Sequence, residues 1–346
     1  MKPIGFAALG LDHRHIYGMT QGMLDAGAEL AGWWTEGDPQ PRAGFVKRFP
    51  DAPQRSLEEL LEDPGIDLVL IACRPDRRAD LAITAMRAGK DVMVDKPGCI
   101  TADELARLRE TVAETGRIWS VNFSERFEVP ATTVATQLVR DGAIGTVVHT
   151  VGLGPHRLNA ATRPDWFFTS AAYGGILTDI ASHQIEQFLH FTGSEDAEIM
   201  MASVGNFANP DIPDFEDFGQ ISLRSDRAQG YIRVDWYTAD ALPNWGDGRL
   251  FISGTEGTIE LRKYVDVAGR PGTDHLFLVN GERCEHIDCS AAPLPYFGNL
   301  IADIRNRTES ACPQERTFRV CELAMEAQRI AARCGANGKR HTEPDG

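Results

Sequence analysis

Short apolar runs alternate with amphipathic stretches along the first third of the chain. Five of these runs have the length of a buried strand. They lie at residues 4–10, 30–34, 67–72, 91–95 and 118–121. Strands that alternate with helices form parallel sheets, because each crossover to a parallel neighbour needs room for a helix. The pattern therefore predicts a doubly wound parallel sheet, and we place this α/β domain at residues 1–122.

Two of the intervening stretches carry clear helix boundaries. Residues 79–88 are amphipathic and stop at a glycine. Residues 101–115 open with Thr101 and Glu104 in a capping-box spacing and end before Gly116. Both signals favour helices that cross over between strands.

The pattern changes after about residue 122. Helices are predicted at 130–141 and 174–192 and near 294–309 and 317–334. Strands are predicted at 146–153, 197–207, 216–224, 228–237, 249–254, 257–263 and 274–279. Neighbouring strands joined by short connections are antiparallel by default. We therefore expect an α+β domain with a large open, mainly antiparallel sheet at 123–334, and a flexible tail at 335–346.

Charge and cysteine usage narrow the class of protein. The 346 residues hold 35 Lys and Arg against 50 Asp and Glu, a net charge of −15, which disfavours nucleic acid and anionic membranes as partners. No apolar run reaches the length of a spanning helix. Seven cysteines without CxxC spacing argue against a disulfide framework or a zinc knuckle. These features favour a cytoplasmic protein with free thiols.

The turn after the first strand is a degenerate nucleotide-binding turn. Gly10 is the one glycine that fits a GxGxxG pattern, and Asp12 and His15 stand where the other glycines would be. A turn that leads into a helix N-terminus still offers backbone N–H groups to phosphate, and His13 or Arg14 could add positive charge. The alternative is a strand–turn–helix that binds no phosphate.

Two further features near this turn bear on ligands. Glu36 follows the second strand, where an acid accepts hydrogen bonds from ribose hydroxyls and repels a 2′-phosphate, which favours NAD over NADP. The alternative is a solvated loop acid. His13 and His15 form an HxH pair, but no third ligand lies nearby in the sequence, so we predict no metal.

The strongest candidates for chemistry lie further along the chain. Lys96 follows a predicted parallel strand and precedes a proline, at the sheet edge where α/β proteins bind ligands. Asp179 and His183 lie one helical turn apart, opposite an apolar stripe that includes Leu177 and Ile185. An exposed lysine and a solvated helix face are the alternatives. Two glycines precede this helix, and we expect a ligand to approach them closely.

Taken together, these motifs resemble the glucose–fructose oxidoreductase / inositol dehydrogenase / MocA (Gfo/Idh/MocA) family. The family's Glu-Lys-Pro corresponds to Asp95-Lys96-Pro97, and its Gly-Gly-x-x-x-Asp-x-x-x-His helix corresponds to residues 174–183. Weaker similarities are the segment 122–127 (NFSERF), residues 142–145 before a strand, and residues 252–257 (ISGTEG). The resemblance covers about residues 3–334. It implies a Rossmann domain that binds a dinucleotide and a second domain that binds substrate.

The chain departs from the family pattern in three places. Asp95 replaces a glutamate, the glycine turn is degenerate, and residues 73–75 read Cys-Arg-Pro where the family more often has Thr-Pro-Asn. The first change shortens the side chain by one methylene. The other two bear on how the cofactor is held.

The resemblance implies a hydride transfer between nicotinamide C4 and a hydroxyl-bearing carbon of a sugar, polyol or cyclitol. His183 would be the general base, Lys96 would donate a hydrogen bond to the reacting oxygen, and Asp179 would orient His183 or bind a neighbouring hydroxyl. The cofactor is expected to be NAD, with NADP as the alternative. The expected cofactor-binding residues are Gly10, Asp12, His13, Glu36, Cys73, Arg74, Asp95 and Lys96. The expected substrate-binding residues are Arg126, His156 and Trp166.

Two other functions stay open at this point. The family also resembles NAD-dependent glycosidases, which would release no NADH. A nucleotide sensor without catalysis would explain the degenerate turn, although it leaves Lys96, Asp179 and His183 unexplained. The open sheet predicts a homodimer or homotetramer.

Overall fold

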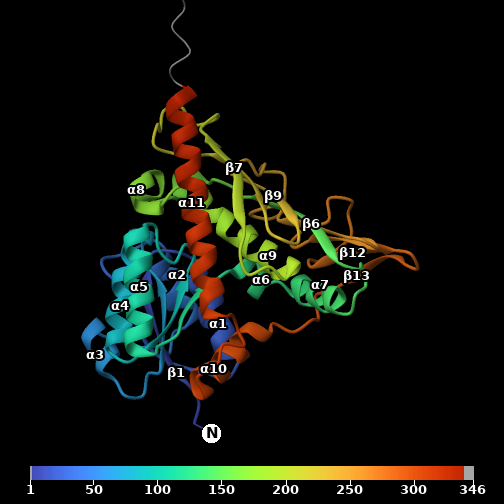
Figure 1. Cartoon of the computed structure of the whole chain (residues 1–346). Coiled ribbons are helices and arrows are strands. Elements are labelled where there is room, and N and C mark those ends of the chain that lie inside the picture. The colour runs from blue at the N-terminus through green and yellow to red at the C-terminus, as the bar shows by residue number, and fades with distance from the viewer. Residues whose placement is uncertain (1, 339–346) are drawn as a thin grey trace, which may run out of the picture. The chain divides into compact units, whose positions relative to one another are not determined.

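A computed structural model describes residues 2–338 of the chain (Figure 1). The chain forms two compact units. The first holds Met1–Phe123 and Pro295–Cys321, and the second holds Ser124–Leu294 and Glu322–Gly346. The expected second domain, 123–334, differs from this grouping over Pro295–Cys321. The expected tail at 335–346 overlaps the last helix as far as residue 338, and residues 339–346 lie outside the described part.

The first unit contains the predicted parallel sheet. Its strands are β1 (Gly5–Leu11), β2 (Glu29–Trp34), β3 (Leu68–Ala72), β4 (Asp91–Asp95) and β5 (Trp119–Asn122). They lie in the order β2-β1-β3-β4-β5, and each neighbouring pair is parallel. The chain leaves β1 toward β2 and then crosses to β3 on the other side, so the order reverses between β1 and β3. This reversal is where doubly wound sheets bind their ligands.

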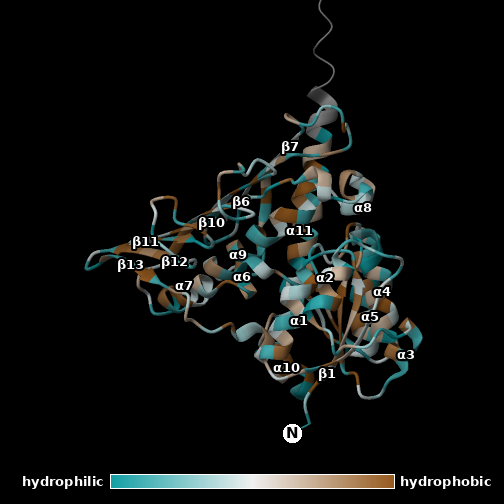
Figure 2. Cartoon of the chain, turned by 180° about the vertical axis from the view of Figure 1, so that it is seen from behind, coloured by the Kyte–Doolittle hydropathy of each residue, from teal (hydrophilic) through white to brown (hydrophobic). Residues whose placement is uncertain are grey.

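Helices cover both faces of this sheet, whose strands are brown in the hydropathy view (Figure 2). The helices of this region are α1 (His15–Asp25), α2 (Pro41–Arg48), α3 (Leu57–Glu62), α4 (Pro75–Arg87) and α5 (Ala102–Thr115). The predicted capping box is present, because the side chains of Thr101 and Glu104 each accept from the other's backbone N–H. Gly116 ends α5 in the left-handed conformation, as the sequence predicts.

Two late segments join this unit because their side chains pack on β5. These are α10 (Pro295–Asn306) and the first two turns of α11 (Gln314–Gly338). The Tyr296 hydroxyl lies 2.8 Å from the Ser120 hydroxyl. Trp119 stacks on Phe318 with ring centroids 5.3 Å apart. Sequence periodicity detects these helices but not the partner that their apolar faces cover.

The second unit is built on one large sheet. Its strands are β6 (Val147–Pro155), β7 (Glu198–Gly205), β8 (Phe218–Arg224), β9 (Gln229–Asp235), β10 (Arg249–Gly254), β11 (Gly257–Arg262), β12 (His275–Asn280) and β13 (Cys284–Asp288). The order is β13-β12-β11-β10-β6-β9-β8-β7. The last strand, β13, is absent from the predicted set, and its mostly exposed residues explain why no apolar run marks it.

The sheet is mainly antiparallel, as the sequence predicts. One neighbouring pair, β6 with β9, is parallel and departs from the antiparallel pairing that short connections favour by default. The reason is a crossover: a long helical segment and the β7–β8 hairpin separate β6 from β9 in the chain. The remaining helices are α6 (Ser124–Phe127), α7 (Pro130–Arg140), η1 (Ala160–Thr162), η2 (Asp165–Phe168), α8 (Ser170–Tyr173), η3 (Leu177–Ala181) and α9 (Ser182–Thr192).

The helix α9 packs closely on the sheet because two residues of β6 beneath it, Gly152 and Gly154, are glycines. A Cβ atom at Gly152 would lie 2.7 Å from the side chain of Gln184, and one at Gly154 would lie 2.8 Å from it. A side chain at Gly152 would meet the Cβ and Cγ atoms of Gln184 and push α9 away from the strand, whereas one at Gly154 would meet only the amide end of Gln184. Gly152 therefore fixes the position of the helix that carries His183.

Within residues 2–338, no helix is both long and apolar enough to cross a membrane. Six cysteines of the described region have free thiols, among them Cys284 and Cys289.

Candidate active site

The turn after β1 is held against the end of β3. Asp12 N and His13 N both donate to the Ala72 carbonyl, at 3.1 and 3.0 Å. Gly10 has φ of 71°, and a Cβ atom there would lie 2.4 Å from Cys73 Cβ. Only glycine fits at this position, because both the left-handed backbone and the close approach exclude a side chain.

A cavity of about 500 Å³ opens beside this turn. Its lining includes five of the expected cofactor-binding residues: Gly10, Asp12, Glu36, Cys73 and Arg74. They come from the ends of β1, β2 and β3, which flank the point where the strand order reverses. The volume is in the range of small-molecule sites, and an acid at the end of β2 suits ribose hydroxyls. The residues present therefore fit the adenosine end of a dinucleotide.

The charge of this cavity is mixed. Burial raises the pKa of Asp12, and the Glu36 carboxylate adds to the rise, while Arg78 and Arg74 oppose it. Arg74 donates to Asp76 and Arg77 also lines the cavity. Guanidinium groups beside an acid can receive either a ribose diol or a phosphate.

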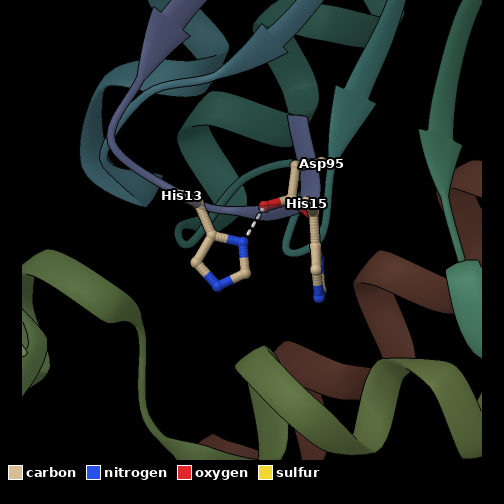
Figure 3. Close-up of side chains that lie close together, drawn as sticks. All are labelled: His13, His15 and Asp95. Carbon is tan, nitrogen blue, oxygen red and sulfur yellow. Dashed lines mark hydrogen bonds and ion pairs between the residues drawn. The ribbon is translucent and has the colours of Figure 1, made fainter. Parts of the chain in front are cut away.

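Three side chains converge on the other side of the turn (Figure 3). His13 Nδ1 lies 2.8 Å from Asp95 Oδ2, and His15 Nδ1 lies 2.8 Å from Asp95 Oδ1. Asp95 is fully buried at the end of β4, and Arg78 Nη2 also donates to its Oδ2, at 2.8 Å. The expectation that the histidine pair has no third ligand nearby is wrong, because β4 brings Asp95 to it from 80 residues away.

The expectation that His13 adds positive charge at this turn is also wrong. Burial and, to a smaller extent, repulsion from His15 lower the pKa of His13 to about 3, although the Asp95 carboxylate opposes both effects. The His13 imidazole is therefore neutral near pH 7. The Asp95 carboxyl has a pKa well below its usual value because Arg78 and the two histidines outweigh its burial.

Lys96 follows Asp95 at the end of β4 and is almost fully buried. Its ammonium group acts electrostatically on His13, so it belongs to the same corner of the first unit. The structure thus groups the expected cofactor residues in two sets. One set lines the cavity, and the other, His13, Asp95 and Lys96, lies at the end of β4.

In the second unit, the expected helix begins with a π-helical turn. Leu177–Ala181 is η3, and α9 continues from Ser182. Single π turns inside helices are frequent at functional sites. Gly174 and Gly175 have φ of 86° and 87°, and a Cβ atom at Gly175 would lie 2.2 Å from the Gln328 side chain. The diglycine is thus explained by backbone conformation and packing, and the expected close approach of a ligand is not needed.

Asp179 and His183 are both buried, with exposures of 9% and 1%. The apolar stripe of Leu177 and Ile185 is buried as predicted. The solvated face considered for Asp179 and His183 is absent, because almost every side chain of α9 is enclosed. A buried imidazole is sensitive to the charges around it.

A second, fully buried charge beside this helix comes from Glu125, a residue that the sequence did not single out. Glu125 Oε2 accepts from Gln184 Nε2 and from Lys263 Nζ, both at 2.8 Å. Lys263 also donates to Gln187 Oε1 at 2.9 Å. Despite complete burial, the pKa of Glu125 is lowered to about 2, because Lys263, His183 and His156 stabilise its carboxylate. Glu125 and Lys263 are 138 residues apart, so no local signal points to the pair.

The expected substrate-binding residues have three different surroundings. Arg126 donates twice to Glu186, at 2.6 Å each. His156 lies with its ring centroid 5.3 Å from that of Trp236, and its electrostatic interaction with Glu125 favours the carboxylate. Trp166 packs against Phe167 in the same aromatic cluster as Trp236. The structure thus brings His156 and His183 to one carboxylate, whereas the charge of Arg126 is neutralised by Glu186.

Two family descriptions match the two units of this chain. Residues 7–123 match an oxidoreductase family with an NAD-binding Rossmann fold. Residues 132–260 match the GFO/IDH/MocA C-terminal domain. The chain belongs to the GFO/IDH/MocA family. The resemblance stated from the sequence motifs is thereby confirmed, as is the combination of a Rossmann sheet with a large, mostly antiparallel sheet.

Proteins similar to this chain include one with a crystal structure and two dehydrogenases of Bacillus subtilis. A crystal structure of a protein from Erwinia carotovora atroseptica SCRI1043 has 46% identity and a TM-score of 0.91, covering 95% of this chain and 98% of that one. Scyllo-inositol 2-dehydrogenase (NAD(+)) of Bacillus subtilis is 31% identical over 58% of this chain and 56% of its own length. Scyllo-inositol 2-dehydrogenase (NADP(+)) IolW, also of Bacillus subtilis, is 30% identical over 45% of this chain and 44% of its own length. The chain thus spans about half the length of these two enzymes, and the pair uses both nicotinamide cofactors.

Proposed function

We propose that this protein is an NAD(P)-dependent dehydrogenase that acts on a hydroxyl-bearing carbon of a sugar, polyol or cyclitol. The observation that carries the proposal is the cavity where the strand order reverses, with Gly10 against Cys73 and Glu36 at the end of β2. Membership of an NAD-binding oxidoreductase family supports it. Inositol dehydrogenases among the relatives indicate the substrate class.

In this proposal, His183 accepts the proton of the reacting hydroxyl. Its imidazole becomes positively charged when it does so, and the buried Glu125 carboxylate favours that charge. Lys96 donates a hydrogen bond to the same oxygen as it gains negative charge. Asp179, four residues before His183, binds a neighbouring hydroxyl or orients the imidazole. The bound nicotinamide supplies the hydride chemistry.

NAD is the preferred cofactor in this proposal. Glu36 lines the cavity and would repel a 2′-phosphate, while its carboxylate accepts from the ribose hydroxyls. Arg74 and Arg77 line the same cavity, so the discrimination against NADP is expected to be moderate.

A spectrophotometric screen tests the proposed reaction. NAD and NADP are each offered with a panel of sugars, polyols and cyclitols, and NADH or NADPH formation is followed. We expect stoichiometric NADH from at least one cyclitol or polyol. Cleavage of a glycoside with tightly bound NAD and no net NADH would instead identify the hydrolytic alternative. Binding of NAD without either reaction would identify a nucleotide sensor.

We also propose that the chain assembles into a homodimer or homotetramer through the large sheet. Apolar side chains on its strands are unusually exposed: Val148 at 41%, Met200 at 48% and Val279 at 47%. A second sheet would cover them. Light scattering at micromolar concentration tests this, and a monomer would refute it.

A further inference from the structure

The histidine pair beside Lys96 is not explained by the proposed mechanism. His13 and His15 lie at the start of α1, and each ring nitrogen Nδ1 lies 2.8 Å from a different oxygen of Asp95. The rings are 4.2 Å apart between centroids and nearly perpendicular, at 84°. Two imidazoles that share one buried carboxylate form a built site rather than a surface feature.

The carboxylate fixes which nitrogen carries the proton. An ionised carboxylate is acceptor-only, so His15 Nδ1, which is hydrogen-bonded to Asp95 Oδ1, must bear hydrogen. His13 Nδ1 lies 2.8 Å from Asp95 Oδ2, and the carboxylate charge favours a hydrogen on that nitrogen too. A neutral imidazole then has its lone pair on Nε2. In Figure 3 the Nε2 ends of both rings point away from Asp95 in the same direction. With side-chain exposures of 22% and 31%, both rings are mostly buried and only partly accessible, whereas the Asp95 side chain has no exposed surface.

A divalent metal is the obvious alternative ligand for two histidines and an aspartate. The charges around Asp95 oppose it. Arg78, with 1% exposure, is paired to Asp95 Oδ2 at 2.8 Å, and the Lys96 ammonium acts on His13 as a further positive charge. A metal ion between the two Nδ1 atoms would therefore find the Asp95 charge already neutralised by Arg78. It would also be repelled by the positive charges of Arg78 and Lys96.

The position of the pair indicates which part of a ligand it meets. The cavity with Glu36 lies over the ends of β2, β1 and β3, on the adenosine side of the reversal in strand order. Asp95 ends β4, on the other side. A dinucleotide that crosses the reversal directs its nicotinamide half toward β4. The pyrophosphate would occupy the backbone N–H groups at the start of α1. Beyond it, the groups that reach the end of β4 are hydroxyls of the second ribose or of a substrate, and hydroxyls can donate to acceptors.

From these observations, the geometry points to a further binding site: the Nε2 atoms of His13 and His15 accept hydrogen bonds from a vicinal diol. This inference rests on the proposed function. The diol comes either from the nicotinamide ribose or from the polyol substrate, since both present neighbouring hydroxyls. Asp95 is a positioning residue in this site, because it holds both rings without touching the ligand.

A calorimetric titration with ADP and ADP-ribose separates the two sources. ADP-ribose carries the second ribose diol and ADP does not. In the wild type, the ribose source predicts that ADP-ribose binds at least tenfold more tightly than ADP. His13→Phe/His15→Phe should abolish this advantage and leave ADP affinity within twofold. Gln21→Ala, in the same helix but hydrogen-bonded to Asp25, is the control and should change neither.

The substrate source gives a different pattern. The double variant then keeps the wild-type affinity for ADP-ribose, while KM for the polyol that the wild type oxidises rises at least tenfold. Single variants His13→Asn and His15→Asn, checked by thermal melting, provide the same readouts if the double variant fails to fold. Each should lose about half of the effect on a logarithmic scale.

Two results would overturn the inference. One is a double variant that matches the wild type within twofold for ADP-ribose and for polyol KM. The other is stoichiometric ZnCl₂ binding that is lost in the double variant, which would make the cluster a metal site. If the wild type binds neither ADP nor ADP-ribose, the proposed function itself fails, and the inference fails with it.

Discussion

The buried pair of Glu125 and Lys263 gives the sharpest test of the energetics around His183. Replacing Lys263 by Met keeps most of the side-chain volume but removes the ammonium that lies 2.8 Å from Glu125 Oε2. The carboxylate then stays buried with Gln184 as its remaining donor in the described network. Removing one partner of a buried ion pair lowers the free energy of unfolding by about 3–5 kcal/mol, because the other charge is left uncompensated.

The pH dependence follows from the same pair. In the folded wild type, the pKa of Glu125 is about 2, against an ordinary value of 4.5. Because the folded value is depressed, the resulting stabilisation is fully present above 4.5 and is lost as the pH falls toward 2. In Lys263→Met, burial dominates and raises the pKa of Glu125. The stability difference between variant and wild type should therefore shrink as the medium is acidified from pH 7.

Urea unfolding followed by circular dichroism at several pH values measures both effects. The double variant Glu125→Gln/Lys263→Met is the control, because it removes both charges and should recover much of the lost stability. A loss below about 1 kcal/mol for Lys263→Met would show that the pair is solvated rather than buried. A double variant no more stable than Lys263→Met would show that packing, not charge, explains the loss.

The remaining predictions concern the cofactor cavity. Glu36→Ala should lower the preference for NAD over NADP at least about tenfold, because a lost repulsion of roughly 1.4 kcal/mol corresponds to a factor of ten. The ratio of kcat/KM with NAD to kcat/KM with NADP measures this preference. An unchanged ratio would place Glu36 outside the ribose site. Gly10→Ala should weaken NADH binding and destabilise the first unit by roughly 1–3 kcal/mol, because the new Cβ atom meets Cys73 at 2.4 Å in a left-handed backbone. Thermal melting and fluorescence titration check both parts, and a variant with unaltered melting and NADH affinity would contradict the packing argument.

Local patterns predicted the elements well because their signals lie within a few residues. The capping box of Thr101 and Glu104 and the stop at Gly116 are present as predicted. The five parallel strands match their apolar runs within a residue or two at each end. These features depend on backbone hydrogen bonding and side-chain alternation, which neighbouring residues decide.

Contacts between residues far apart in the sequence were not predicted, because no pattern of neighbouring residues indicates them. The parallel pairing of β6 with β9 depends on the crossover between them. Asp95 lies 80 residues from His15 in the sequence but contacts both histidines. Burial lowers the pKa of His13 and keeps it neutral, whereas the motif suggested a positive charge at this turn. Spacing on a helix could place Asp179 and His183 on one face, but only the packing of α9 shows that both are buried.

The central claim is that His183 is the proton acceptor of an NAD(P)-dependent alcohol oxidation. The direct measurement compares wild type with His183→Ala for NADH affinity and for the rate of NADH formation from the best polyol. We predict unchanged NADH affinity and a fall in kcat of at least about a hundredfold. Undiminished turnover in His183→Ala would contradict the account.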